Sequence, residues 1–518
     1  MSRLKRICLA TAAVALASGA LAADQQTADQ LQSQLRAMMK SWGNPLSDQV
    51  NVKPEDDAYS VEMPLMGWRA QDGTTPAVAT ATAKPVGNGS WSIDNFELPS
   101  PATIMTPGPD GKPVDRTAIS FKEQTSRWTF DPAANFITAE SVLLNGISFH
   151  DVKPGSPEQH IGSFSMQGGL SPTGPDHGTL DGTGEAKDIA ITGKDDKGPV
   201  YVTIGRLGII AHVTNAARAQ IAQLMSGLRQ LGSMPTPPKG GQPTPEQRAA
   251  MVAMFNSLNG IADSGNIHYA VEHLNVTGSQ DFGIDHLGIG IAASAPEGLL
   301  KITFDLGVDG IKAPEMPATM KAYIPTHLQI QPYVTGVSAA DVPRIAAIAL
   351  GDQGPDAAAG PAMQAAFAHG GLKIGLETLS IDIGPAKITG VGEITVAQPD
   401  PSAITGEAKL TGKGIDELLK QVQADPQAAQ AVPMLVFARG LAKPQPDGTL
   451  FWDVVYNSNG LLVNGVVMMP PGGPASAGGP GGSVPPDRDQ VAPHTPPVPN
   501  LAPGKQGSVP GAGGLKSK

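Results

Sequence analysis

The sequence predicts an α+β fold dominated by β-structure: an elongated, curved antiparallel sheet with three inserted helical hairpins and a disordered C-terminal tail. Three features lead to this prediction. Long stretches alternate between apolar and polar residues, a unit of strand, two helices and strand occurs three times, and the sequence from Pro470 onward is rich in Pro and Gly.

The clearest strand pattern is LLKITFDLGVDG at 299–310. Polar residues such as Lys301 and Asp305 alternate strictly with apolar ones, which is typical of a half-buried antiparallel strand. The apolar residues form a candidate ligand face: Leu300, Ile302, Phe304, Leu306 and Val308. A second pattern, at 449–465, predicts a hairpin that turns at Asn459-Gly460.

The repeated unit begins with a strand at 201–214, at 327–337 and at 406–413. Each strand is followed by two segments with helical periodicity, and each pair leads into another strand. A further helix is expected at 24–43, before the first strands. The helical pairs are expected at 215–231 and 245–261, at 338–350 and 361–371, and at 414–423 and 426–441.

Two strands of the repeat interrupt their alternation at the same place. In IHYAVEHLNV (267–276) the apolar phase slips at Glu272-His273, and in LKIGLETLSI (372–381) it slips at Glu377-Thr378. A slip of one residue would move the apolar set to the opposite face. A β-bulge would absorb the extra residue and bend the strand while the apolar face stays continuous. Both alternatives are open, and the bulge is favoured because a core or groove needs a continuous apolar face.

The N-terminus has the pattern of an export signal. A basic start, an Ala-rich apolar run and the small-x-small sequence Ala20-Leu21-Ala22 predict cleavage before Ala23 and a periplasmic location. An uncleaved anchor is the alternative, because signal peptides and N-terminal anchors overlap in length. The lone cysteine, Cys8, lies within the signal, so the mature chain is expected to have no disulfide and no thiolate metal site.

Composition divides the chain into four parts and limits its partners. The parts are the signal peptide (1–22), an N-terminal helix with a β-rich region (23–200), the repeat region (201–469) and the tail (470–518). The formal charge is −11, and no basic run is present, so binding to nucleic acid is excluded. No integral membrane span is expected after signal cleavage, since no other segment approaches the length of a spanning helix.

The sequence assigns no catalytic, metal or cofactor residues. His273 and His286 occupy matching places in VEHLNV and IDHLGI, and in a hairpin they could face one another. A zinc site would need one or two further ligands beside them. The segment GEAKLTGKG (406–414) comes closest to a phosphate loop, but its spacing is wrong and Gly414 replaces the Ser or Thr that binds magnesium. We therefore expect a protein that is not an enzyme and has no cofactor.

The segment ITGVGEITVAQPDPSAITGEAKLTGKGIDELLKQVQ, with the closing hairpin LFWDVVYNSNGLLVNG, carries a family resemblance (388–465). It resembles a recurring unit of uncharacterised proteobacterial periplasmic proteins, the YdgA-like family and its alphaproteobacterial relatives, and more distantly the AsmA-like envelope proteins. The AsmA-like resemblance implies an elongated sheet with an apolar trough, associated with phospholipid movement. The cleavable signal and the Pro/Gly tail depart from that family's pattern, which puts a bridging role between membranes in doubt.

Three hypotheses for function follow. In the first, a periplasmic envelope protein binds a lipid or other apolar ligand in a trough of the sheet. In the second, it is an envelope scaffold that binds other envelope proteins without a small ligand. The third, a hydrolase, would need Ser, His and Asp to converge in one cleft. The helices discriminate between the first two: if Ala-rich faces such as Ala346, Ala347 and Ala349 seal the sheet completely, there is no trough.

Overall fold

The computed structural model describes residues 23–469 except for 42, 72, 108–112, 133–135, 154, 175, 235–242, 259, 279–280, 318–320, 343–344, 346–369, 398–403 and 427. All described residues belong to one compact unit. The expected signal peptide, the expected tail and the three alanines at 346, 347 and 349 lie outside the described residues.

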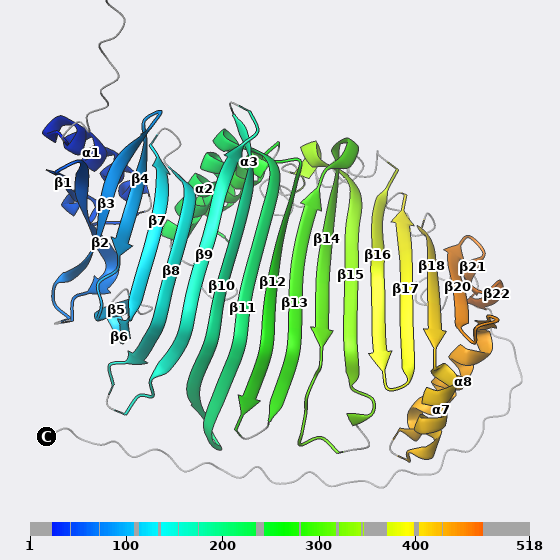
Figure 1. The fold of residues 1–518 in the computed structure, drawn as a ribbon. Coiled ribbons are helices and arrows are strands. Elements are labelled where there is room, and N and C mark those ends of the chain that lie inside the picture. The colour runs from blue at the N-terminus through cyan, green and yellow to red at the C-terminus, as the bar shows by residue number, and fades with distance from the viewer. Residues whose placement is uncertain are drawn as a thin grey trace, which may run out of the picture. The chain divides into compact units, whose positions relative to one another are not determined.

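One antiparallel sheet of 22 strands forms this unit (Figure 1). Its strands pair mainly with their neighbours in sequence, so a long meander runs from β7 to β18 and ends in the hairpins of β20, β21 and β22. The β-dominated antiparallel fold predicted from the sequence is confirmed. The strands are β1 (Asn51–Glu55), β2 (Ala58–Arg69), β3 (Pro76–Gly87), β4 (Ser90–Glu97), β5 (Ala102–Pro107), β6 (Pro113–Ser120), β7 (Glu123–Asp131), β8 (Phe136–Asp151), β9 (Gln159–Pro172), β10 (His177–Asp195), β11 (Gly198–Ala217), β12 (Ser264–Thr277), β13 (Phe282–Ser294), β14 (Leu299–Asp309), β15 (Pro325–Ser338), β16 (Leu372–Ile383), β17 (Ala386–Val396), β18 (Ile404–Lys413), β19 (Lys443–Pro444), β20 (Leu450–Asn457), β21 (Gly460–Val463) and β22 (Val466–Met469).

The N-terminal strands pair in a closed ring that the alternation patterns did not predict. The order around the ring is β2, β3, β4, β7, β8, β6, β5 and back to β2. The last step is short and joins Trp68 and Arg69 of β2 to Ile104 and Thr103 of β5. The sheet therefore grows from this ring through β8 and β9, and it passes position 200 inside β11 without a break.

Helices occupy the positions that the repeat predicts, where they are described. The pair α2 (Arg218–Ser233) and α3 (Pro245–Leu258) separates β11 from β12, and α7 (Ile415–Ala424) with α8 (Val432–Leu441) separates β18 from β20. The middle pair, after β15, falls largely outside the described residues. In Figure 1, α2 and α3 lie behind the sheet. None of the described helices is long and apolar enough to span a membrane.

Two packed clusters lie at opposite ends of the sheet. At the N-terminal end, α1 (Gln25–Ser41) buries Leu31 and Leu35 against strands β2, β3, β4 and β7. Trp91, buried in that cluster, donates a hydrogen bond from Nε1 to Gln34 Oε1 at 3.0 Å. At the C-terminal end, α7 buries Leu418 against a smaller cluster that includes the outer part of β17 and β20. These clusters are cores in the ordinary sense, whereas the sheet between them is only partly covered.

The two alternation slips have different structural causes. In β16 the register with β17 shifts between Leu376 and Leu379, so the predicted bulge is present there. In β12 the register on both sides of His273 is unbroken, because Glu272 pairs with His286 and Leu274 pairs with Ile284. The slip there occurs at a left-handed residue, since His273 has φ of +53°. The bulge prediction is therefore wrong for β12.

Left-handed residues recur at the level of His273 in alternate strands of the meander. Gly146 in β8 has φ of +58° and Asp188 in β10 has φ of +52°. In the strands between them, Gly162 and Gly205 leave room for the neighbouring side chains: a Cβ at Gly162 would lie 2.9 Å from Asp188 Cβ, and one at Gly205 would lie 3.2 Å from His273 Cβ. We call the level of these residues the crease. It interrupts the alternation of several neighbouring strands at the same height.

Candidate functional site

Strand register assembles the predicted apolar residues into one continuous face. The central row passes from β7 to β20, and its members lie directly opposite one another in successive strands. They are Ser126, Val142, Met166, Gly184, Ile209, Tyr269, Ile289, Leu306, Ile330, Leu379, Gly390, Leu410 and Trp452.

Three further rows flank the central row on the same face, because residues two positions apart in a strand point the same way. We call the four rows together the apolar face. The first flanking row is Trp128, Glu140, Gly168, Gly182, Ala211, Ile267, Ile291 and Phe304. The second is Leu144, Phe164, Ala186, Leu207, Val271, Leu287, Val308, Leu328, Ile381 and Ile388. The third is Leu180, Val213, Gly265, Ala293, Ile302, Val334, Ile374 and Ile394.

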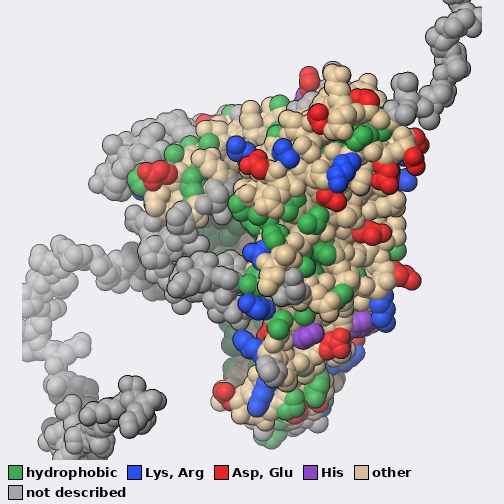
Figure 2. All heavy atoms as spheres, turned by 90° about the vertical axis from the view of Figure 1, so that its left-hand side faces the viewer, with side chains coloured by type: hydrophobic (Ala, Val, Ile, Leu, Met, Phe, Trp, Pro, Cys, Tyr) green, Lys and Arg blue, Asp and Glu red, His purple; other side chains and the backbone are tan. Residues whose placement is uncertain are grey.

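The apolar face is substantially open to solvent in its middle. Phe304 is 47% exposed and Leu306 is 37% exposed, while Ile289, directly opposite Leu306, is 47% exposed. Apolar residues at the C-terminal end of the face are covered instead, as Ile388 and Trp452 are by the α7 cluster. Figure 2 shows hydrophobic side chains in a hollow on one side of the molecule, with acidic and basic side chains along the opposite margin and some Lys or Arg side chains beside the hollow.

Of the five residues predicted from the sequence, four belong to the rows, one to each row: Ile302, Phe304, Leu306 and Val308. Leu300 lies next to them at the start of β14. Leu300 pairs with Val337, and the other four pair with the apolar residues of β13. Register, which the sequence does not give directly, extends this one-strand prediction into a surface across the sheet.

The opposite face carries a ladder of charged and polar side chains. Its members face one another from β10 to β18 and are Lys187, Arg206, Glu272, His286, Asp309, His327, Asp382, Lys387 and Lys413. Arg206 Nη1 donates to Glu272 Oε1 at 2.7 Å, and His327 Nδ1 lies 2.6 Å from Asp309 Oδ1. Such pairs are partly exposed and stabilise the sheet weakly, by about 0–1 kcal/mol each, so the ladder mainly fixes the register of the strands.

A second polar cluster on this face is centred on Tyr333. Its hydroxyl donates to Glu393 Oε2 at 2.5 Å, and Lys373 Nζ donates to Glu393 Oε1 at 2.9 Å. Burial, followed by the hydrogen bond to Glu393, raises the pKa of Tyr333 to about 12. The Tyr333 ring lies over Gly375, where a Cβ would come within 2.2 Å of Cε1. The cluster therefore depends on a glycine and holds its phenol neutral, and it contains no nucleophile beside a free base.

The structure does not bring His273 and His286 together across their hairpin. His273 lies opposite Asp285 in the unbroken register and does not face His286, whose partner across the hairpin is Glu272. His268 and His286 instead lean over Gly288, where a Cβ would lie 3.2 Å and 3.3 Å from their respective Nε2 atoms. Within the described part of the chain, no group of three or more His, Cys, Asp or Glu residues is arranged to hold a metal ion.

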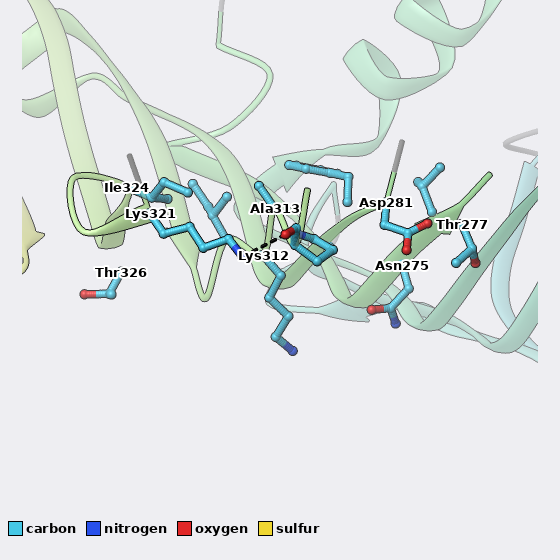
Figure 3. Close-up of a pocket in the computed structure, with 13 residues that line it drawn as sticks. Asn275, Thr277, Asp281, Lys312, Ala313, Lys321, Ile324 and Thr326 are labelled. Atoms are coloured by element: carbon cyan, nitrogen blue, oxygen red, sulfur yellow. Dashed lines mark hydrogen bonds between the residues drawn. The ribbon is translucent and has the colours of Figure 1, made fainter. Parts of the chain in front are cut away.

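A cavity of about 550 Å³ lies beyond the ends of β12 and β13 (Figure 3). Its walls include Asn275, Asp281, Lys312 and Lys321, and Lys321 Nζ donates to the Pro314 carbonyl at 2.7 Å. The described residues that line it include no Ser, Cys or His, so this cavity offers no nucleophile with a neighbouring imidazole. We therefore take the apolar face as the candidate functional site.

Comparisons with protein-family models, with curated proteins and with solved structures found no match.

Proposed function

We propose that this chain is a non-enzymatic envelope protein that binds a lipid acyl chain or a similar apolar chain along its apolar face. The observation that carries the proposal is the exposure of Phe304, Ile289 and Leu306. Ile289 and Leu306 pair in the central row, and Phe304 lies in the row beside it. Monomeric soluble proteins rarely leave a contiguous apolar surface of this kind without a use for it.

The dimensions of the open part suit an extended chain. Adjacent strands are about 4.8 Å apart, so the central row covers about 24 Å from Ile209 in β11 to Leu379 in β16. This is comparable with the length of a common fatty acyl chain. Each methylene removed from water on such a surface contributes roughly 0.8 kcal/mol. Contact along the row therefore contributes favourably to binding.

The apolar surface also suits an uncharged chain better than a polar ligand. Within the four rows, the described residues contain one acidic side chain, Glu140, and no basic one. On the other face, charged side chains pair with one another, as Arg206 does with Glu272 and Lys373 with Glu393. The location of this activity in the periplasm rests on the export signal at the N-terminus and belongs to the same proposal.

A scaffold that binds envelope proteins is the second candidate. It is favoured by α8, whose outer residues Met434 and Phe437 are 76% and 58% exposed while Val432 and Leu435 pack inward. An exposed apolar helix surface at the end of a sheet is a common site of protein association.

The test is mass spectrometry of solvent extracts from the protein purified from the periplasm without detergent, with an unrelated periplasmic protein handled identically. We expect a specific lipid in roughly stoichiometric amount. Phe304→Asp should remove it, because a charge in the middle of the face is costly to desolvate. Thr303→Asp, the neighbour on the opposite face, should retain it. Clean protein in every case would overturn the lipid proposal and favour the scaffold.

A further inference from the structure

Glu140 is the exception on the apolar face. It lies in β8, opposite Trp128 of β7 on one side and Gly168 of β9 on the other. It is half-buried, and none of the other described residues in the four rows has an acidic or basic side chain. A lone carboxyl group on such a surface costs free energy through desolvation, unless something satisfies it.

The carboxyl group of Glu140 is directed along its own row. Its Oε1 lies 3.6 Å from the position that a Cβ on Gly168 would take, and that position is 3.7 Å from the Gly182 Cα. Gly168, Gly182 and Ala211 follow one another across β9, β10 and β11, so a strip of nearly bare backbone leads away from the carboxyl group. Beyond this strip the row continues with Ile267, Ile291 and Phe304.

Glu140 has no ion pair or hydrogen bond with any described side chain, and burial alone raises its pKa. Trp128 is the cross-strand partner of Glu140 in β7, and its ring is packed on Phe96 with 4.1 Å between ring centroids. A carboxylate beside an indole ring is a combination that favours a cation, since both the charge and the π-system attract it. An anionic group would be repelled by Glu140 and by the formal charge of −11.

We propose that Glu140 and Trp128 hold the ammonium head group of an amphiphile, whose alkyl chain lies along the row from Gly168 toward Phe304. This inference rests on the proposed function and names the class of ligand: a chain with a cationic amine at one end. About six strand spacings, roughly 29 Å, separate Glu140 from Phe304, which leaves room for a long chain.

The experiment compares three twelve-carbon ligands on the full chain: dodecylammonium and dodecanoate below their micelle concentrations, and dodecanol below its solubility limit. Binding is measured by isothermal titration calorimetry at neutral pH. We expect dodecylammonium to bind most tightly and dodecanoate most weakly. Glu140→Gln should weaken dodecylammonium about tenfold or more, the effect of losing one interaction with a charged group, and should leave dodecanol unchanged.

Glu407→Gln is the matched control, because it removes the same charge from an exposed position in β18 on the opposite face. It should leave all three affinities unchanged. Trp128→Phe should weaken dodecylammonium by a smaller factor, because phenylalanine keeps an aromatic ring with a weaker attraction for cations.

The two proposals fail in distinguishable ways. If dodecanol binds and Glu140→Gln does not alter the preference among head groups, the apolar face stands and the ammonium site is overturned. An equal loss with Glu407→Gln would also overturn it, since the effect would be one of net charge. If none of the three ligands binds, the proposed lipid function itself is overturned.

Discussion

Tyr269 and Ile289 lie directly opposite each other in β12 and β13, and both remain exposed, by 42% and 47% respectively. A cross-strand pair of this kind usually covers a core. Here the pair belongs to a surface that the described helices leave open, because α1 and α7 pack at the two ends of the sheet. The middle of the apolar face is therefore available to a ligand or partner without any unfolding of the sheet.

Because the middle of the face is open, substitutions there should cost little stability. Ile289→Thr keeps a β-branched side chain in the strand, and we expect it to lower the free energy of unfolding by less than about 1 kcal/mol. Leu31→Ala in α1 removes a fully buried side chain and should cost about 2–5 kcal/mol. Urea unfolding measures both. Equal costs would mean that the face is sealed in solution as an ordinary core.

The sequence predicts individual strands more completely than it predicts which residues of neighbouring strands lie opposite them. Strict alternation from Leu300 to Val308 is a local property of the chain, and it identified β14 and the direction of its side chains. The face across the strands depends on register, and the pairing of Phe304 with Ile291 cannot be read from either segment alone. Glu140 was missed for the same reason: only the structure places this acid in a row of Gly, Ala and Ile.

The bulges illustrate a second limit. A phase slip in the apolar pattern shows that alternation is interrupted, but a bulge and a left-handed residue interrupt it equally well. The glycines of the neighbouring strands, Gly162 and Gly205, were a signal for the crease, since they lie beside Asp188 and His273. The N-terminal ring was not predictable, because it closes through a contact as short as that of Trp68 with Ile104.

The crease makes His273 a sensitive position. Its φ of +53° is tolerated by His and Asn but is strongly unfavourable for a β-branched residue. We expect His273→Val to lower the free energy of unfolding by about 1–2 kcal/mol, whereas His273→Asn should be nearly neutral. Thermal unfolding of the two variants provides the measurement. If valine were as well tolerated as asparagine, the left-handed conformation at this residue would be contradicted.

The raised pKa of Tyr333 leads us to expect that the folded state loses stability at alkaline pH. Its pKa in the folded chain is about 12, raised from 10.0, so the neutral phenol stabilises the folded state fully below pH 10.0. The unfolded chain loses the proton first, and this contribution therefore decreases as the pH rises from 10.0 to about 12. Tyr333→Phe has no such proton, and the difference in unfolding free energy between the two proteins should shrink over this range.

The same tyrosine can be observed directly. The chain has six tyrosines, and the difference in ultraviolet absorbance between the wild type and Tyr333→Phe isolates the phenolate of one of them. We expect the isolated signal to titrate near pH 12 in the folded protein. Glu393→Gln, which removes the carboxylate acceptor, should lower the midpoint, because the negative charge of Glu393 opposes ionisation of the phenol. A midpoint at the ordinary value would show that the Tyr333–Glu393 hydrogen bond is not formed in solution.

We expect the carboxyl group of Glu140 to lower the stability of the ligand-free protein at neutral pH and to stabilise the protein when an ammonium ligand is bound. Burial raises the pKa of this carboxyl group above 4.5, so its protonated form is favoured in the folded state. The unfolded chain releases the proton near pH 4.5, and the folded state therefore loses relative stability as the pH rises through the folded pKa. Glu140→Gln has no charge to desolvate and should melt at a higher temperature than the wild type at pH 7, with a smaller difference below pH 4.5. A calorimetric comparison at both pH values, without ligand, measures this.

Saturating dodecylammonium should reverse the order at pH 7, because only the wild-type carboxylate gains a cationic partner. If ligand-free Glu140→Gln melts no higher than the wild type at pH 7, the carboxyl group is already solvated or paired, and the desolvated site that the ammonium proposal requires is absent.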